Sequence, residues 1–227
     1  MHLATHYTAM WREALPRLES NSIATDPLID DPNDHRLGLT LVIRPAAEVK
    51  QRMVEFVQQL QGFEPDQYYY PPSDMHVTLL TLISCYEGFS LDQVDLDAYT
   101  QLLAGVVQEA RPFTLDFTGI TASAATVMVQ GFPRSEALQQ LRSRLRTAFH
   151  VSGLPQTIDK RYVLQTAHST VARFRAPLQQ RQRFVEALQQ YRQHVFGSMQ
   201  VEQVELVCND WYHRAAVGQR LTEFWLA

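Results

Sequence analysis

Apolar and polar residues alternate along this chain in blocks that predict strands and helices in the same order twice. An apolar run at residues 39–43 is followed by Pro45 and an amphipathic stretch, residues 46–60, with apolar side chains at helical spacing. A second apolar run, residues 127–132, ends in Pro133 and precedes another amphipathic stretch. Proline lacks the N–H that the first helical turn leaves unpaired, so we expect each proline to open its helix. The apolar face of the second helix is expected to contain Leu138, Leu141, Leu145, Ala148 and Phe149.

Each half then continues with a strand that carries the same four-residue pattern. The first copy is His76-Val77-Thr78-Leu79 and the second is His168-Ser169-Thr170-Val171, each inside a run with the composition of a buried strand. Side chains of a strand alternate between its two faces. The histidine and the threonine of each copy are therefore expected to point the same way.

The segments that follow the two motifs also correspond. The first half is predicted to continue with a helix over 91–110 and a strand over 113–117, and the second half with a helix over 178–194 and a strand over 199–208. We expect the strand of the first half to form a hairpin, through a turn at residues 119–123, with the strand that opens the second half. The repeated order indicates an α+β protein with two pseudo-symmetric lobes in one compact body.

The N-terminal region lies outside this repeat. Residues 1 to about 20 follow a helical pattern, with a kink or break expected at Pro16. Residues 24–35 are acidic and rich in turn formers, which predicts a loop. We therefore divide the chain into an N-terminal helical extension with an acidic loop, residues 1–36, and a single domain of intertwined lobes, residues 37–227.

Composition and charge restrict the class of protein. The 227 residues are 45% hydrophobic, which is enough for a sizeable core, and the net charge of −4 argues against a protein that coats long nucleic acid. Cys85 and Cys208 offer no disulfide framework and no metal-ligand spacing. The chain shows no apolar window of membrane-spanning length and no signal-peptide pattern at its start. We expect a cytoplasmic monomer that binds no membrane.

The two motifs offer the groups that acid–base chemistry on a phosphate requires. If the two strands lie side by side near a pseudo-twofold axis, the imidazoles of His76 and His168 face each other across a groove. An ordinary imidazole pKa of about 6.5 lets one ring act as an acid and the other as a base near neutral pH. Thr78 and Thr170 can donate hydrogen bonds to the non-bridging phosphate oxygens, where charge grows in the transition state. This chemistry needs no metal and no other cofactor.

On these two motifs, and on the repeated order of strand, proline, helix, loop and motif, the chain resembles the 2H phosphoesterase superfamily. That superfamily includes 2′–5′ RNA ligase-like proteins and cyclic nucleotide phosphodiesterases. The resemblance implies a bilobal fold with a cleft between two antiparallel sheets, and metal-independent catalysis on 2′,3′-cyclic or 2′–5′ phosphate linkages. It implies catalytic roles for His76, Thr78, His168 and Thr170. It favours His76 as the acid and His168 as the base, although the pseudo-symmetry makes these roles exchangeable.

Other side chains are candidates for holding a small nucleotide or an RNA terminus. The tyrosine run 68–70 either stacks on a base or packs over a sheet edge. Arg173 is out of phase with His168 on an ideal strand, so it either helps to hold phosphate or is a charge at the sheet edge or on the opposite face. Lys160 and His213 are further candidates for the cleft. The substrate-binding set is Tyr70, Tyr86, Arg161, Arg173 and Tyr212.

Two alternatives stay open at the level of sequence. The same cleft could belong to a non-catalytic module that binds nucleotides or RNA ends, which the acidic net charge favours. A metal-dependent hydrolase would instead use other histidines, but none of them shows metal-ligand spacing. Those histidines are His35, His150, His194 and His213. The sequence does not decide between hydrolysis and ligation, and it does not name the base of the substrate.

Overall fold

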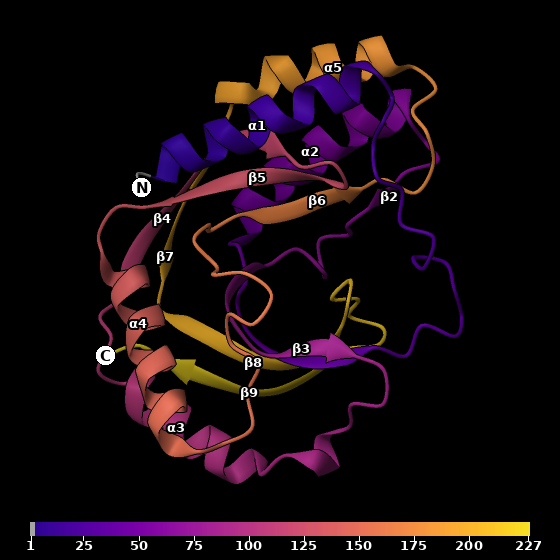
Figure 1. Cartoon of the computed structure of the whole chain (residues 1–227). Helices are drawn as coiled ribbons and strands as arrows, with labels where there is room; N and C mark the ends of the chain where they lie inside the picture. Colours follow the sequence, from indigo (N-terminus) through magenta and orange to yellow (C-terminus); the bar gives the residue numbers. More distant parts are fainter. Residues whose placement is uncertain (1–2) are drawn as a thin grey trace.

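Two antiparallel sheets flanked by helices make up the computed structural model, which describes residues 3–227 (Figure 1). The four-stranded sheet has the order β3-β1-β8-β9, and the five-stranded sheet has the order β2-β6-β5-β4-β7. This architecture confirms the predicted α+β class with two lobes. The first sheet contains β1 (Leu37–Ile43), β3 (Val77–Tyr86), β8 (Gln203–Asp210) and β9 (Gln219–Trp225). The second contains β2 (Tyr68–Tyr69), β4 (Phe113–Ala122), β5 (Thr126–Pro133), β6 (Ser169–Arg173) and β7 (Val195–Val201).

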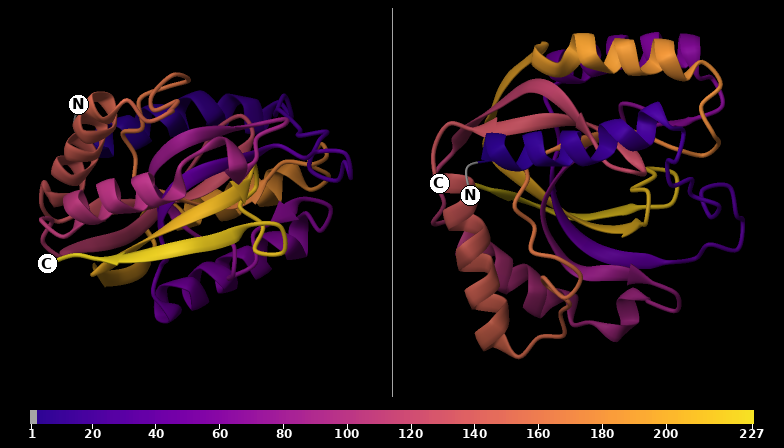
Figure 2. Two further views of the ribbon diagram at one scale, coloured as in Figure 1. Left: turned by 90° about the horizontal axis from the view of Figure 1, so that it is seen from below. Right: turned by 45° about the horizontal axis from the view of Figure 1, so that its top comes forward.

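The helices divide between the two sheets. Three helices lie on the five-stranded sheet, and the right-hand view of Figure 2 shows two of them, α2 and α5, beside each other. Two helices lie on the side of the four-stranded sheet. The first group is α1 (Leu3–Glu19), α2 (Ala47–Phe63) and α5 (Arg181–Gln190), and the second is α3 (Leu96–Val107) and α4 (Ala137–Ser152). Short 3₁₀ turns occupy Leu91–Gln93 and Tyr191–Gln193. No helix within residues 3–227 is both long enough and apolar enough to cross a membrane.

The two sequence halves exchange elements. Strand β4 follows the first motif but pairs with β5 in the five-stranded sheet, and β8 follows the second motif but pairs with β1 in the four-stranded sheet. Helix α2 packs against β6 and β7, whereas α4 packs against α3 and β3. Each sheet therefore contains the motif strand of one half and a later strand of the other half. The segment predicted as one strand at 199–208 is divided between β7 and β8 for the same reason.

The two motif strands lie in separate sheets and are not hydrogen-bonded to each other. β3 is an edge strand of the four-stranded sheet, and β6 lies between β2 and β5 in the other sheet. The motifs therefore face each other from separate sheets. β3 and β6 are not paired with each other, because each forms its hydrogen bonds with neighbouring strands of its own sheet.

Local predictions about prolines were wrong in part. Helix α1 has no break at Pro16 and continues to Glu19, because only the last turn follows the proline and Leu18 is buried in the core. Pro45 lies two residues before the start of α2, and Pro133 lies four residues before the start of α4. Pro133 still pairs with Leu115 in the sheet. These prolines end strands rather than open helices.

The hairpin between β4 and β5 turns later than expected. Gly119 lies inside β4 at a shift in strand register, with φ of +71°, and a Cβ there would lie 2.3 Å from the carbonyl oxygen of Arg192. Glycine is therefore required by close packing and by a left-handed backbone rather than by a turn. The turn itself is held by the Ser123 hydroxyl, which accepts from the N–H groups of Ala125 and Thr126 at 3.1 Å.

The N-terminal helix is packed into the five-stranded sheet. Its buried Tyr7 donates a hydrogen bond to the carbonyl oxygen of Gly131 at 3.2 Å and accepts one from the N–H of Ala167 at 3.0 Å. Ala167 directly precedes His168, so this helix supports the second motif. The division between residues 1–36 and 37–227 stays a prediction.

Candidate active site

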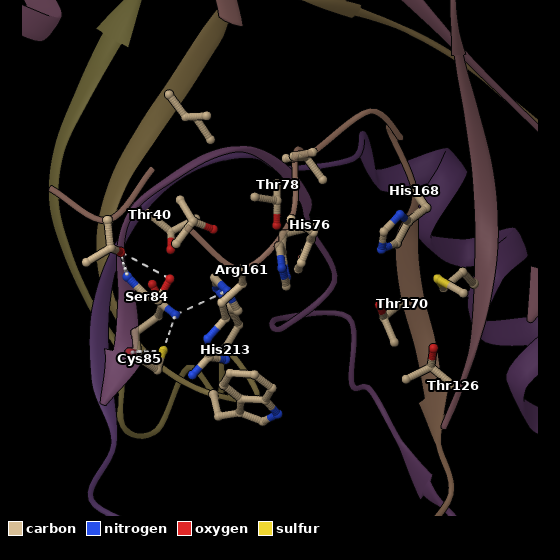
Figure 3. Close-up of a pocket in the computed structure, with 18 of the residues that line it drawn as sticks. Thr40, His76, Thr78, Ser84, Cys85, Thr126, Arg161, His168, Thr170 and His213 are labelled. Carbon is tan, nitrogen blue, oxygen red and sulfur yellow. Dashed lines mark hydrogen bonds between the residues drawn. The ribbon is translucent and has the colours of Figure 1, made fainter. Parts of the chain in front are cut away.

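One cleft of about 260 Å³ between the sheets is lined by both motifs. His76 directly precedes β3 and His168 directly precedes β6, and each threonine follows two residues later. Figure 3 shows His76 with Thr78 on one side of the cleft and His168 with Thr170 on the other. Two imidazoles and two hydroxyls therefore share one solvent-connected space.

The His76 ring is held by main chain. It is only 8% exposed, and its Nδ1 lies 2.7 Å from the carbonyl oxygen of Asp74. A carbonyl oxygen can only accept a hydrogen bond, so Nδ1 carries a proton and Nε2 is the nitrogen available to a ligand. Burial lowers the pKa of His76 to about 4, against the opposing effect of the Asp74 carbonyl.

The His168 ring is held by a side chain instead. Its Nδ1 lies 2.8 Å from the hydroxyl oxygen of Thr166, which can donate or accept. Burial lowers its pKa to about 4, and the positive charges of His76 and Arg142 act in the same direction. Burial therefore favours the neutral form of both imidazoles, in contrast to the near-neutral titration expected from the sequence. A bound phosphate favours the protonated forms.

A buried arginine connects the two motif strands. Arg142 on α4 is 0% exposed and donates to the carbonyl oxygens of Leu79 at 2.8 Å, Thr78 at 2.9 Å and Thr166 at 2.7 Å. Two of these carbonyls belong to β3 and the third precedes His168. Burial lowers the pKa of Arg142 to about 10, which leaves it charged at neutral pH. The arginine thus fixes the spacing of the motifs and places a positive charge near His168.

A sequence model of the 2'-5' RNA ligase superfamily matches residues 47–210, a segment that includes both motifs. The chain belongs to the 2'-5' RNA ligase superfamily. This confirms the resemblance to the 2H phosphoesterases that the paired motifs indicated.

Solved structures share the fold of this superfamily member. TT0787 of Thermus thermophilus has a TM-score of 0.61 at 22% identity, over 83% of this chain and 97% of that one. LigT of E. coli complexed with 3'-AMP has a TM-score of 0.55 at 18% identity, over 85% and 99%. A protein of unknown function from Agrobacterium tumefaciens, ATU0111, has a TM-score of 0.55 at 14% identity, over 92% and 97%. At these identities the likeness shows the fold alone. No curated protein matches the chain.

Arg173 of this superfamily member lines the cleft, which the strand periodicity did not predict. Met128 pairs with Thr170 and the next residue, Val127, pairs with Ala172, so one residue of β6 bulges out of register. A bulge of one residue shifts the side-chain alternation, and Arg173 returns to the face of Thr170. Its guanidinium lies 3.5 Å from the Asp26 carboxylate, so the acidic loop positions it.

The remaining predicted binding residues divide between the cleft and its surroundings. Tyr70 is buried and lines the cleft, whereas Tyr68 and Tyr69 form the edge strand β2. Arg161 also lines it, with its guanidinium 4.8 Å from the ring centre of Trp211.

Two of the predicted residues lie outside the lining. Tyr86 is 44% exposed and donates to Gln93 at 2.9 Å, because it stands at the solvent end of β3. Tyr212 is buried behind Arg173, where its hydroxyl donates to Asp26 at 3.2 Å. Tyr212 therefore supports Arg173 and does not reach the cleft. Lys160 is exposed and is also outside the lining.

His213 has a place that the sequence did not reveal. Its ring stacks on His76, with ring centres 3.9 Å apart and planes 29° apart. The other histidines of the metal alternative are elsewhere: His35 in the loop before β1, His150 on α4 and His194 before β7. Residues 3–227 gather no group of three or more potential metal-ligating side chains. The sequence named His213 as a loop candidate, but no spacing pattern could indicate the stack.

Proposed function

We propose that this protein is a metal-independent phosphoesterase that cleaves 2′,3′-cyclic phosphates or 2′–5′ linkages of RNA ends or small nucleotides. The observation that carries the proposal is the convergence of the two His-x-Thr pairs on one cleft from separate sheets. Membership of the 2'-5' RNA ligase superfamily supports the reaction class. The solved structures of E. coli LigT with 3'-AMP and with ATP support a small nucleotide as the ligand.

The reaction proceeds by proton transfer at both ends of an in-line displacement. One imidazole removes a proton from water, and the water oxygen forms a bond to phosphorus. The bond between phosphorus and the sugar oxygen breaks, and the other imidazole gives a proton to that oxygen. Each transfer contributes roughly 10²–10⁴ in rate. The hydroxyls of Thr78 and Thr170 donate to the non-bridging oxygens, and the Arg173 guanidinium adds positive charge at the same cleft.

The surroundings of the two rings support one order of roles. The carbonyl and the carboxylate of Asp74 favour a protonated His76 against the opposing charge of Arg44, whereas the charge of Arg142 favours a neutral His168. We therefore expect His76 to take the proton first when an anionic substrate is bound. We assign His76 as the acid and His168 as the base, with Nδ1–H of His168 donating to Thr166.

Turnover of defined nucleotides tests the proposal. The protein is incubated in EDTA with nucleoside 2′,3′-cyclic phosphates and with 2′–5′ linked dinucleotides, and products are separated by chromatography. His76→Ala and His168→Ala should each lower kcat by at least ~10² while the near-UV circular dichroism is retained. His150→Ala, an exposed residue on α4, is the matched control and should retain wild-type kcat. Tight binding without turnover in the wild type would instead select the nucleotide-binding module.

A further inference from the structure

His213 stands apart from the motifs, yet its ring is in direct contact with that of His76. The two rings stack with centres 3.9 Å apart, and His213 comes from the loop that follows β8. Its backbone has φ of +57°, in the left-handed region that few residues other than glycine adopt. The fold therefore holds an uncommon backbone conformation at the residue that covers the face of His76.

The protonation of the His213 ring is also constrained. The Asn209 side-chain amide donates to Asp210 at 2.9 Å, which fixes its orientation, and the same nitrogen lies 3.2 Å from Nε2 of His213. An amide nitrogen can only donate, so this contact favours the His213 tautomer in which Nε2 accepts. Burial lowers the pKa of His213 well below its usual value, which favours the neutral ring. A neutral aromatic face is a suitable platform for an imidazolium.

The loop that carries His213 is attached to the segment that orients His76. The N–H of Ala215 donates to the Asp74 carboxylate at 3.0 Å, and the carbonyl oxygen of Asp74 accepts from Nδ1 of His76. The ring of His76 is thus held at its edge by Asp74 and at its face by His213. Both holding groups depend on the same loop, residues 211–218.

We propose that His213 is a positioning residue for His76, whose neutral stacked ring holds the His76 imidazole with Nδ1 on Asp74 and Nε2 presented to the scissile bond. The part of this proposal that concerns catalysis rests on the proposed phosphoesterase function. The stack excludes water from one face of His76 and prevents the ring from rotating. Charged and titratable groups around His76 are Asp74, Arg44 with its partner Glu205, the stacked His213, and His168 across the cleft.

Two kinds of substitution separate the ring from the backbone. His213→Asn and His213→Gly suit the left-handed backbone and remove the stack, whereas His213→Phe keeps an aromatic face without a titratable group. Nitrogen-15 NMR of the ligand-free protein reports the tautomer and the pKa of His76 directly. We expect wild type and His213→Phe to keep the Nδ1–H tautomer. In the Asn and Gly variants the tautomers should mix, and the pKa of His76 should rise by at least about one unit as water enters.

Kinetics give the second readout. At its own pH optimum, His213→Asn should lower kcat by about tenfold with KM within about threefold, since the ring contributes to proton transfer and not to binding. His213→Phe should recover most of that loss, and the exposed His150→Asn should match wild type. An unchanged tautomer and pKa of His76 in both the Asn and Gly variants, with the fold intact, would overturn the proposal. The NMR result stands even if no substrate is turned over, so failure of the phosphoesterase assignment is a separate outcome.

Discussion

His76 and His168 occupy equivalent positions in the two halves, but different groups hold them. His76 lies on a backbone carbonyl, near a carboxylate and under a second imidazole. His168 lies on the hydroxyl of Thr166 and near the charge of Arg142. The comparison shows that one repeated motif can stand in two different surroundings. The motif places an imidazole directly before a strand, and residues outside the motif decide which groups hold each ring. We propose that these groups also set which ring is the acid.

The largest expected effect tests the two roles directly. With a cyclic phosphate in which sulfur replaces the departing sugar oxygen, the leaving thiolate needs no proton. His76→Ala should then recover most of its roughly 10²–10⁴-fold loss, because the acid is no longer needed, while His168→Ala should remain slow. Steady-state kinetics on the two substrates measure the difference. Recovery in His168→Ala instead would reverse the roles of the two rings.

The next largest effect is expected on stability, from substitution of Arg142, which connects the two motif strands. Arg142→Met leaves three buried carbonyl oxygens without their donor, at about 1–3 kcal/mol for each unsatisfied group. We expect a loss of at least about 3 kcal/mol in the free energy of unfolding, measured in urea. Arg144→Met on the same helix removes a partly exposed ion pair with Glu109 and an exposed hydrogen bond to the Glu109 carbonyl oxygen, and should cost less than about 1 kcal/mol. Equal losses in the two variants would show that Arg142 is not a structural link.

The acid dependence of stability should follow the two rings. Both have pKa values of about 4 in the folded protein and about 6.5 when unfolded, so both are neutral in either state above pH 6.5. As the pH falls from 6.5 to 4, the unfolded chain gains protons first and stability is lost, by up to about 3 kcal/mol for each ring. Urea unfolding across this range measures the slope. The double variant His76→Asn/His168→Asn should reduce the slope and leave the part that is due to His213, whose pKa burial also lowers; an unchanged slope would place the acid sensitivity outside the two motif rings.

Local pattern was sufficient for much of the fold. The period-two and helical patterns located both motif strands and the helices after them, because side-chain alternation is a property of neighbouring residues. The local pattern gave the wrong prediction where a single residue interrupted the regular alternation of a strand. Arg173 faces the cleft only because β6 bulges, and Gly119 interrupts β4 rather than turning the hairpin. A bulge depends on the partner strand, so the sequence of one strand does not reveal it.

The repeated His-x-Thr pairs, their strands and the duplicated α+β order were determined by the sequence itself, since each is encoded within a few consecutive residues. Tertiary structure alone decided that β4 and β8 change sheets, that Arg142 joins the two motifs, and that His213 covers His76. These features join residues far apart in the chain. Their energies depend on burial and on hydrogen-bond partners that exist only once the sheets have packed.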